Sequence, residues 1–154
     1  MRDVEILRAA CASSLAIEKF RPEIVDGKLI THCSENAAHV AEAMGCKELT
    51  GKMADEQYRI MAANESGLWL KCIGSNASLH AQRGGLALAA MTSKMLGEEH
   101  GHITPLTPEP MQMSGSLGRP VPMVLNVGKQ NADEKESAAF PVAKGEADYF
   151  CWLG

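Results

Sequence analysis

Helical patterns occupy the first half of the chain and strand patterns the second, and this order constrains the fold more than any other feature. Helical spacing of apolar residues predicts helices at 3–20, 33–44, 54–61 and 76–82. Strands are predicted at 68–72, 86–91, 102–106, 113–116, 121–127 and 149–153. Helices followed by strands favour an α+β fold, in which N-terminal helices pack against one side of an antiparallel β-sheet.

Two further expectations concern the connections. A turn at Asp26-Gly27 places residues 25–30 in a loop, and the charged segment 131–137 is expected to be a solvated turn.

The segment 86–91 is apolar throughout, which predicts a central strand covered on both faces. Pro105 restricts ladder hydrogen bonding, so the strand that contains it should be short or lie at a sheet edge.

Composition narrows the class of protein. With 154 residues, 45% of them hydrophobic, the chain is predicted to be one folded domain spanning 1–154. The net charge of −4 gives no basic footprint for nucleic acid. No apolar run reaches membrane-spanning length, so no membrane partner is expected. The N-terminus mixes charged and apolar residues unlike a signal peptide, so we expect synthesis in the cytoplasm without a leader.

The five cysteines do not form a metal or disulfide pattern. No two are spaced as Cys-x-x-Cys, and their odd number argues against a full disulfide framework. A Cys46–Cys72 or a Cys11–Cys151 bridge remains open. His100 and His102 are too few for structural zinc, which takes four ligands. The sequence therefore predicts no metal and no cofactor.

Cys33 is the strongest candidate for chemistry. It stands where a helix is expected to begin, and the partial positive charge of a helix N-terminus stabilises a thiolate. His102 follows Gly101 at the start of a predicted strand and would act as base and then as acid toward a leaving amine. The N–H groups of Cys33 and Ser34 would form an oxyanion site. The competing interpretation is a buried small cysteine and a hydrogen-bonded loop histidine.

Three segments also carry a resemblance to a known family. They are Cys33-Ser34 followed by 40–45; the apolar run 84–90 followed by Gly101-His102-Ile103; and Ser114-Gly115-Ser116 with the aromatic ending 148–150. In this order they resemble the type VI secretion amidase effectors, within the papain-like group that includes the CHAP amidases. The resemblance covers the chain from Cys33 to its C-terminus.

The resemblance implies a papain-like cell-wall amidase fold and a cysteine peptidoglycan amidase that cuts an amide bond in bacterial stem peptides. It maps Cys33 to the nucleophile, His102 to the base and Ser114 to the third residue, which orients the imidazole; Asn126 competes with Ser114 for that role. It also implies an antibacterial effector, passed by a secretion apparatus component into the periplasm of a target cell, and a cognate immunity protein.

Two departures from the family pattern keep other functions open. Glu35 lies near the expected thiolate and disfavours it, and Pro105 replaces an apolar strand residue. Both favour the alternative of a non-catalytic papain-like binding module. A cysteine protease or acyltransferase that acts on another amide would use the same two residues, and the sequence does not separate it from an amidase.

Overall fold

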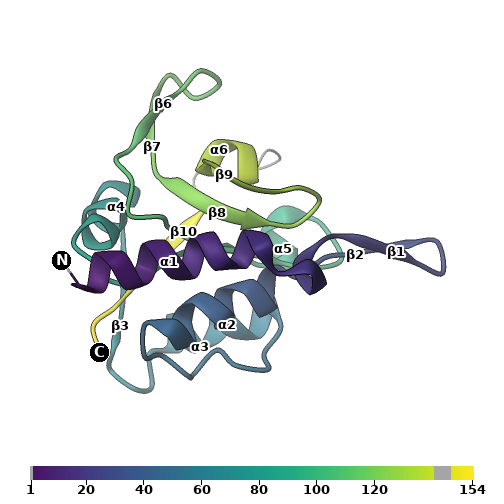
Figure 1. Ribbon diagram of the computed structural model, residues 1–154, viewed down its shortest axis with the longest axis horizontal. Helices are drawn as coiled ribbons and strands as arrows, with labels where there is room; N and C mark the ends of the chain where they lie inside the picture. Colours follow the sequence, from purple (N-terminus) through teal and green to yellow (C-terminus); the bar gives the residue numbers. More distant parts are fainter. Residues whose placement is uncertain (1, 141–146) are drawn as a thin grey trace.

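The computed structural model describes residues 2–140 and 147–154, and within them the chain has the expected α+β architecture (Figure 1). The helices are α1 (Arg2–Ala16), the 3₁₀ turn η1 (Glu18–Phe20), α2 (Cys33–Ala43), α3 (Ala54–Ala63), α4 (Gly74–Gln82), α5 (Ser93–Leu96) and α6 (Glu136–Ala139). The strands are β1 (Glu23–Val25), β2 (Lys28–Ile30), β3 (Trp69–Cys72), β4 (Ala87–Met91), β5 (His102–Pro105), β6 (Gln112–Ser114), β7 (Arg119–Val121), β8 (Met123–Val127), β9 (Asn131–Lys135) and β10 (Asp148–Trp152).

The main sheet has four antiparallel strands in the order β3-β10-β4-β5. Strand β4 therefore lies inside the sheet, and β5 lies at one end of it. Leu106 forms one further bridge to Val124, which brings β8 beside the end of β5. The expected edge position of the strand that contains Pro105 is confirmed by this order.

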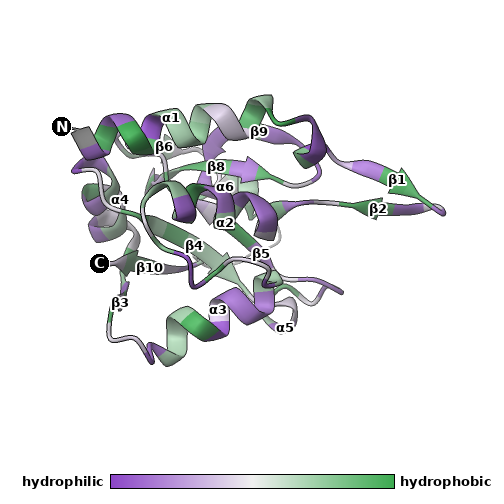
Figure 2. Cartoon of the chain, turned by 60° about the horizontal axis from the view of Figure 1, so that its bottom comes forward, coloured by the Kyte–Doolittle hydropathy of each residue, from purple (hydrophilic) through white to green (hydrophobic). Residues whose placement is uncertain are grey.

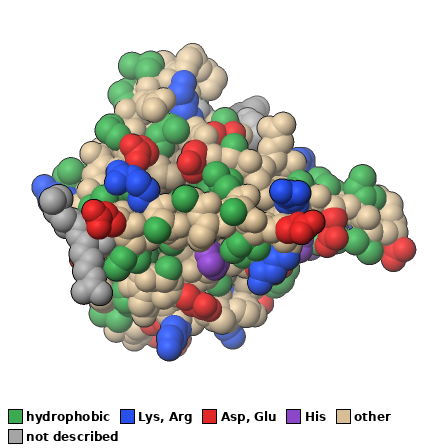
Figure 3. All heavy atoms as spheres, viewed as in Figure 1, with side chains coloured by type: hydrophobic (Ala, Val, Ile, Leu, Met, Phe, Trp, Pro, Cys, Tyr) green, Lys and Arg blue, Asp and Glu red, His purple; other side chains and the backbone are tan. Residues whose placement is uncertain are grey.

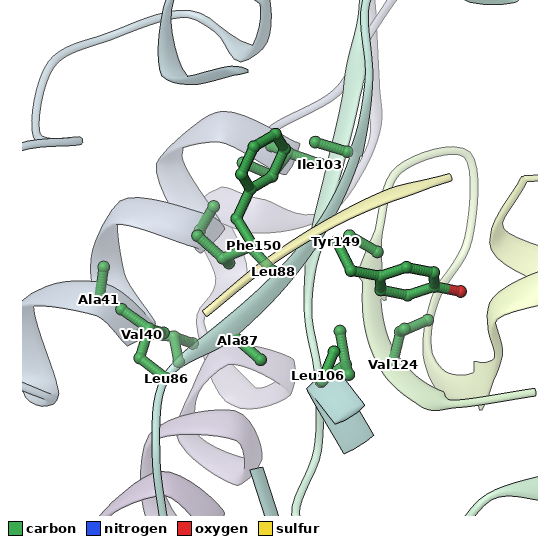
Figure 4. Close-up of a cluster of buried hydrophobic side chains, with 14 of the residues drawn as sticks. Val40, Ala41, Leu86, Ala87, Leu88, Ile103, Leu106, Val124, Tyr149 and Phe150 are labelled. Carbon is green, nitrogen blue, oxygen red and sulfur yellow. The ribbon is translucent and has the colours of Figure 1, made fainter. Parts of the chain in front are cut away.

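Strand β4 is buried on both faces. Leu88 lies opposite Phe150 in the ladder, and the Phe150 ring packs edge-on against Tyr58 of α3 with 5.4 Å between ring centroids. Ala89 lies opposite Tyr149, whose ring covers Gly74 at the start of α4. Figure 4 shows Phe150 on the side of α2 and Tyr149 on the side of β8. The prediction of a central, doubly covered strand is thus confirmed.

The helices cover the sheet unevenly. α2 and α3 pack on one face of it, α4 packs on β4 and β10 from the other face, and α1 contacts both α2 and α4. The prediction of helices at one side holds for α2 and α3 but not for α4. Because α4 covers the second face, the small residues of β4 are enclosed from both directions.

Two connecting segments differ from their sequence-based expectations. The predicted loop at 25–30 is the turn and second strand of a hairpin, β1–β2, with Asp26 at φ 51° and Gly27 at φ 76°. Two successive positive φ angles suit a tight two-residue hairpin turn. The predicted solvated turn at 131–137 is strand β9, paired with β8, followed by the start of α6. Charged residues are uncommon in strands, and only pairing with β8 makes this segment extended.

The β1–β2 hairpin projects from the body of the molecule and carries both hydrophobic and hydrophilic residues (Figure 2). Its exposed side chains include Ile24, Val25, Leu29 and Ile30. Figure 3 shows hydrophobic side chains along this projection and scattered ones elsewhere on the same face.

Within the described residues, no helix is long and apolar enough to cross a bilayer.

We expect the Leu88→Ala substitution to lower the free energy of unfolding by about 3 kcal/mol, because it leaves a cavity between two packed layers. Leu88 has no exposed surface. Leu70 of β3 is 52% exposed and provides the matched control, with an expected loss below about 1 kcal/mol for Leu70→Ala. Urea denaturation measures both. Equal losses in the two variants would show that β4 is not the centre of the core.

Candidate active site

Helix α2 begins at Cys33 and is held at both ends. At its start, the Nδ1 atom of His32 lies 2.7 Å from Oε1 of Glu35, so this carboxylate is turned toward the residue that precedes the helix. At its end, the N–H of Gly45 donates to Glu42 O and that of Cys46 to Ala41 O, with Gly45 at φ 96°. These two bonds form the Schellman motif that a left-handed glycine permits. Gly45 therefore terminates α2, close to the predicted end of the helix at residue 44.

The sulfur of Cys33 faces the start of β5. Its side chain is almost fully buried, and Sγ lies 4.0 Å from the carbonyl oxygen of Gly101. The backbone N–H groups of Ile103, Ser34 and Cys33 itself are placed to stabilise a thiolate. The structure therefore brings the thiol to the strand that His102 begins, although 68 positions separate Cys33 from Gly101.

Gly101 packs closely against Asp55 and Met91, which leaves no room for a side chain at this position. A Cβ atom at this position would lie 2.3 Å from Oδ1 of Asp55 and 2.9 Å from the carbonyl oxygen of Met91. Asp55 is itself fixed, because it accepts hydrogen bonds from the backbone N–H and the hydroxyl of Ser93 at 2.8 and 2.6 Å. The glycine before His102 is thus required by packing.

The imidazole of His102 is held by Asn126. Its Nε2 atom lies 2.7 Å from Oδ1 of Asn126, which comes from the neighbouring strand β8. The ring also packs against Phe140, with 5.0 Å between ring centroids. A Cβ atom at Gly128 would lie 3.3 Å from Cε1 of His102, so the turn after β8 leaves just enough room for the ring.

The thiol and the imidazole approach β5 from different sides. Ile103 shares the face of Leu88 and α2, whereas His102 and Leu106 point toward β8, because successive side chains alternate along a strand. Within the described residues, no hydrogen bond joins Cys33 Sγ to His102. The structure places both groups at one end of β5, and a direct contact between them requires a change of side-chain position.

Burial gives both groups a preference for their uncharged forms. Burial raises the pKa of the Cys33 thiol above its ordinary value; the three N–H groups oppose this rise, and the charge of Glu35 adds to it. Burial also lowers the pKa of His102 below its ordinary value, against the hydrogen bond that the ring donates to Asn126 and the charge of Glu98. At neutral pH the resting site therefore holds a thiol and a neutral imidazole. A pre-formed thiolate–imidazolium pair is not favoured.

Ser114 does not occupy the position beside the imidazole. It is the last residue of β6, and its hydroxyl lies 3.2 Å from that of Ser116 and accepts from the N–H of Leu117 at 3.4 Å. The partner of the His102 ring is Asn126, the competing candidate. The family resemblance implied Ser114, but pairing between β5 and β8 decides which polar residue meets the ring.

Sequence reasoning missed three residues that shape this region: Asp55, Gly128 and Glu134. Glu134 accepts a hydrogen bond from Nδ2 of Asn126 at 2.6 Å. The prediction of a solvated turn at 131–137 excludes Glu134 from the site, because this segment is rich in charged residues. Only Ala132 is apolar in 131–135, so the sequence has no alternating pattern there that would indicate a strand.

Two surface hollows formed by described residues lie away from this site. One, of about 460 Å³, is lined by residues of α3 and its neighbours, including Arg59 and Ile60. A second, of about 430 Å³, lies where α1 and α4 meet the C-terminus and includes Arg83 and Trp152. Neither is lined by Cys33, His102 or Asn126.

Comparison with known proteins adds no assignment, because no family model matches the chain and no curated protein matches it. Within the described residues, no three His, Cys, Asp or Glu side chains come together in a group that could hold a metal ion.

We expect Gly101→Ala to lower the free energy of unfolding by about 1–3 kcal/mol, because the added methyl group meets Asp55 and the backbone of Met91. Gly115 offers a matched control, since nothing lies within 4 Å of a Cβ atom there. Urea denaturation compares the two variants. If Gly101→Ala is no less stable than Gly115→Ala, then β5 does not need close packing at this point.

The second prediction for this site concerns protonation. The titration midpoint of His102 should lie below its ordinary value of 6.5, because burial disfavours the imidazolium form. Histidine NMR resonances followed against pH measure it, with the His102→Gln variant used to assign the signal. A midpoint at or above 6.5 would mean that the ring is solvated.

Proposed function

We propose that this protein is a cysteine amidase of papain-like architecture, which hydrolyses an amide bond in the stem peptides of bacterial peptidoglycan. One observation supports this most: the sulfur of Cys33 contacts the start of the strand that carries His102, and Asn126 holds the imidazole. Cysteine, histidine and asparagine are the catalytic set of papain-like proteases. The resemblance of segments 33–45, 84–90 and 101–103 supports the choice of peptidoglycan.

In the proposed mechanism, Cys33 is activated at the moment of attack. His102 donates a hydrogen bond from Nε2 to Asn126, so its Nδ1 atom is the one that accepts the thiol proton. The sulfur then attacks the carbonyl carbon of the substrate, and the negative charge on oxygen is stabilised by backbone N–H groups at the start of α2. His102 passes its proton to the leaving amine, and water hydrolyses the thioester.

The thiol and the imidazole have to come into contact in this scheme, whether the sulfur attacks the substrate or a small reagent such as iodoacetamide. Catalytic hydrogen bonds are often long or poorly aligned without substrate and tighten in the complex. The two side chains lie at the same end of β5 but approach it from different sides, so the proposal requires one of them to move past the start of that strand.

The biological setting is part of the same proposal. An amidase of this kind would act as an antibacterial effector, delivered by the type VI secretion apparatus into the periplasm of a neighbouring cell. A cognate immunity protein would protect the producer by covering the site around Cys33. The support for this setting is the resemblance to the effector family.

The Cys33→Ala variant should release no new amino groups from purified sacculi, whereas the wild-type protein should release them, because the variant has no nucleophile. Mass analysis of the digest identifies the bond that is cut. Cys72→Ala is the matched control, since Cys72 is a partly exposed cysteine on β3, and it should keep full activity. Equal release by wild type and Cys33→Ala would eliminate Cys33 as the nucleophile.

A second candidate function is a non-catalytic binding module, and one observation favours it. The pKa of the Cys33 thiol is raised, and no hydrogen bond links it to His102 among the described residues. A buried thiol without an activating partner is inert. In this case the site region is structural, and the chain binds a partner through another surface.

The pH dependence of Cys33 alkylation by iodoacetamide separates the two candidates. If His102 activates the thiol, the rate should rise through the pKa of His102, below pH 6.5. If the thiol is inert, the rate should rise only above its ordinary pKa of 9.0, because burial opposes deprotonation. A protease or acyltransferase would match the amidase in this assay and would differ only in the sacculus digest.

A further inference from the structure

Asn126 stands between His102 and a carboxylate. Its Oδ1 atom lies 2.7 Å from Nε2 of His102, and its Nδ2 atom lies 2.6 Å from Oε1 of Glu134. Nδ2 also reaches the carbonyl oxygen of Gln130 at 3.4 Å. The Asn126 side chain is 8% exposed, so water offers it little competition. The three side chains form a chain of hydrogen bonds across β5, β8 and β9.

The chemistry of these groups determines which way the Asn126 amide faces. An ionised carboxylate and a backbone carbonyl only accept hydrogen bonds, so both must meet the NH₂ group of the amide. The amide oxygen is then left to face His102. This oxygen also only accepts, and the Nε2 atom of His102 must therefore carry the hydrogen.

A neutral imidazole carries one hydrogen on its two nitrogens. With that hydrogen on Nε2, the Nδ1 atom has a free lone pair and is the basic nitrogen. We propose that Glu134 is a positioning residue, which holds His102 in the Nε2–H tautomer by fixing the orientation of Asn126. This inference rests on the proposed function, because the tautomer matters for catalysis only if Nδ1 takes the proton of Cys33.

Glu134→Gln is the most informative change at this position. Glutamine keeps the size of the side chain but can both donate and accept. Asn126 can then turn its NH₂ group toward His102, and the ring can carry its hydrogen on Nδ1. The matched control is Asp133→Asn, a neighbour on β9 that is exposed and loses the same charge. Asp133 makes no hydrogen bond to Asn126 among the described contacts.

NMR of the full chain, ¹⁵N-labelled at histidine, gives the tautomer directly from the two nitrogen shifts of each ring. In the wild-type protein, His102 should be in the Nε2–H form above its pKa, and the Nδ1–H form would overturn the proposal without any variant. Glu134→Gln should shift a measurable share of the ring to the Nδ1–H form, while Asp133→Asn should leave it unchanged. An unchanged tautomer in Glu134→Gln would also overturn the proposal.

Sacculus digestion separates this inference from the proposed function. Glu134→Gln should reduce the turnover rate roughly tenfold to a hundredfold, with unchanged stability, as for other groups that orient a functional side chain. A wild-type protein that shows the Nε2–H tautomer and its dependence on Glu134 but no hydrolysis would disprove the amidase and leave the positioning role intact. A wild-type protein that hydrolyses sacculi, but whose His102 tautomer does not depend on Glu134, would disprove the positioning role and leave the amidase intact.

Discussion

The structure depends on the burial of strand β4 between two layers. α2 and α3 cover one face of it, and α4 with the strands around β8 covers the other. Since β4 cannot shift without opening both layers, the paired strand β5 is held at a fixed register, with His102 opposite Met91. The position of His102 and the strand start that Cys33 contacts are therefore consequences of core packing. The candidate site is built on rigid elements rather than on loops.

Burial also sets the chemistry of the site. The same enclosure that fixes the side chains raises the pKa of Cys33 and lowers that of His102, which leaves two neutral groups at neutral pH. A neutral pair stores no separated charge in the resting state, and a proton moves only when the sulfur attacks. The network through Asn126 then becomes important, because a neutral imidazole works as a base only in the correct tautomer.

The sequence predicts most of the helices and the central strand, because periodic apolar residues report burial directly. It also predicts the meeting of Cys33 with the start of the histidine strand. It does not predict the third residue, since the pairing of β8 beside β5 brings Asn126 rather than Ser114 to the ring, and this pairing is a long-range event. It predicts a turn where β9 lies, because this charged segment has no apolar pattern typical of a strand. It therefore does not identify Glu134 as a residue of the site.

The central claim is that Cys33 and His102 act as one unit, and the alkylation rate of Cys33 in the His102→Gln variant tests it most directly. The assay needs no substrate and does not depend on the identity of the natural ligand. The account predicts that iodoacetamide modifies Cys33 at least about tenfold more slowly at pH 7 once the imidazole is gone, because proton removal by a positioned base contributes that much or more. Equal rates in wild type and His102→Gln, with the fold retained in both, would contradict it.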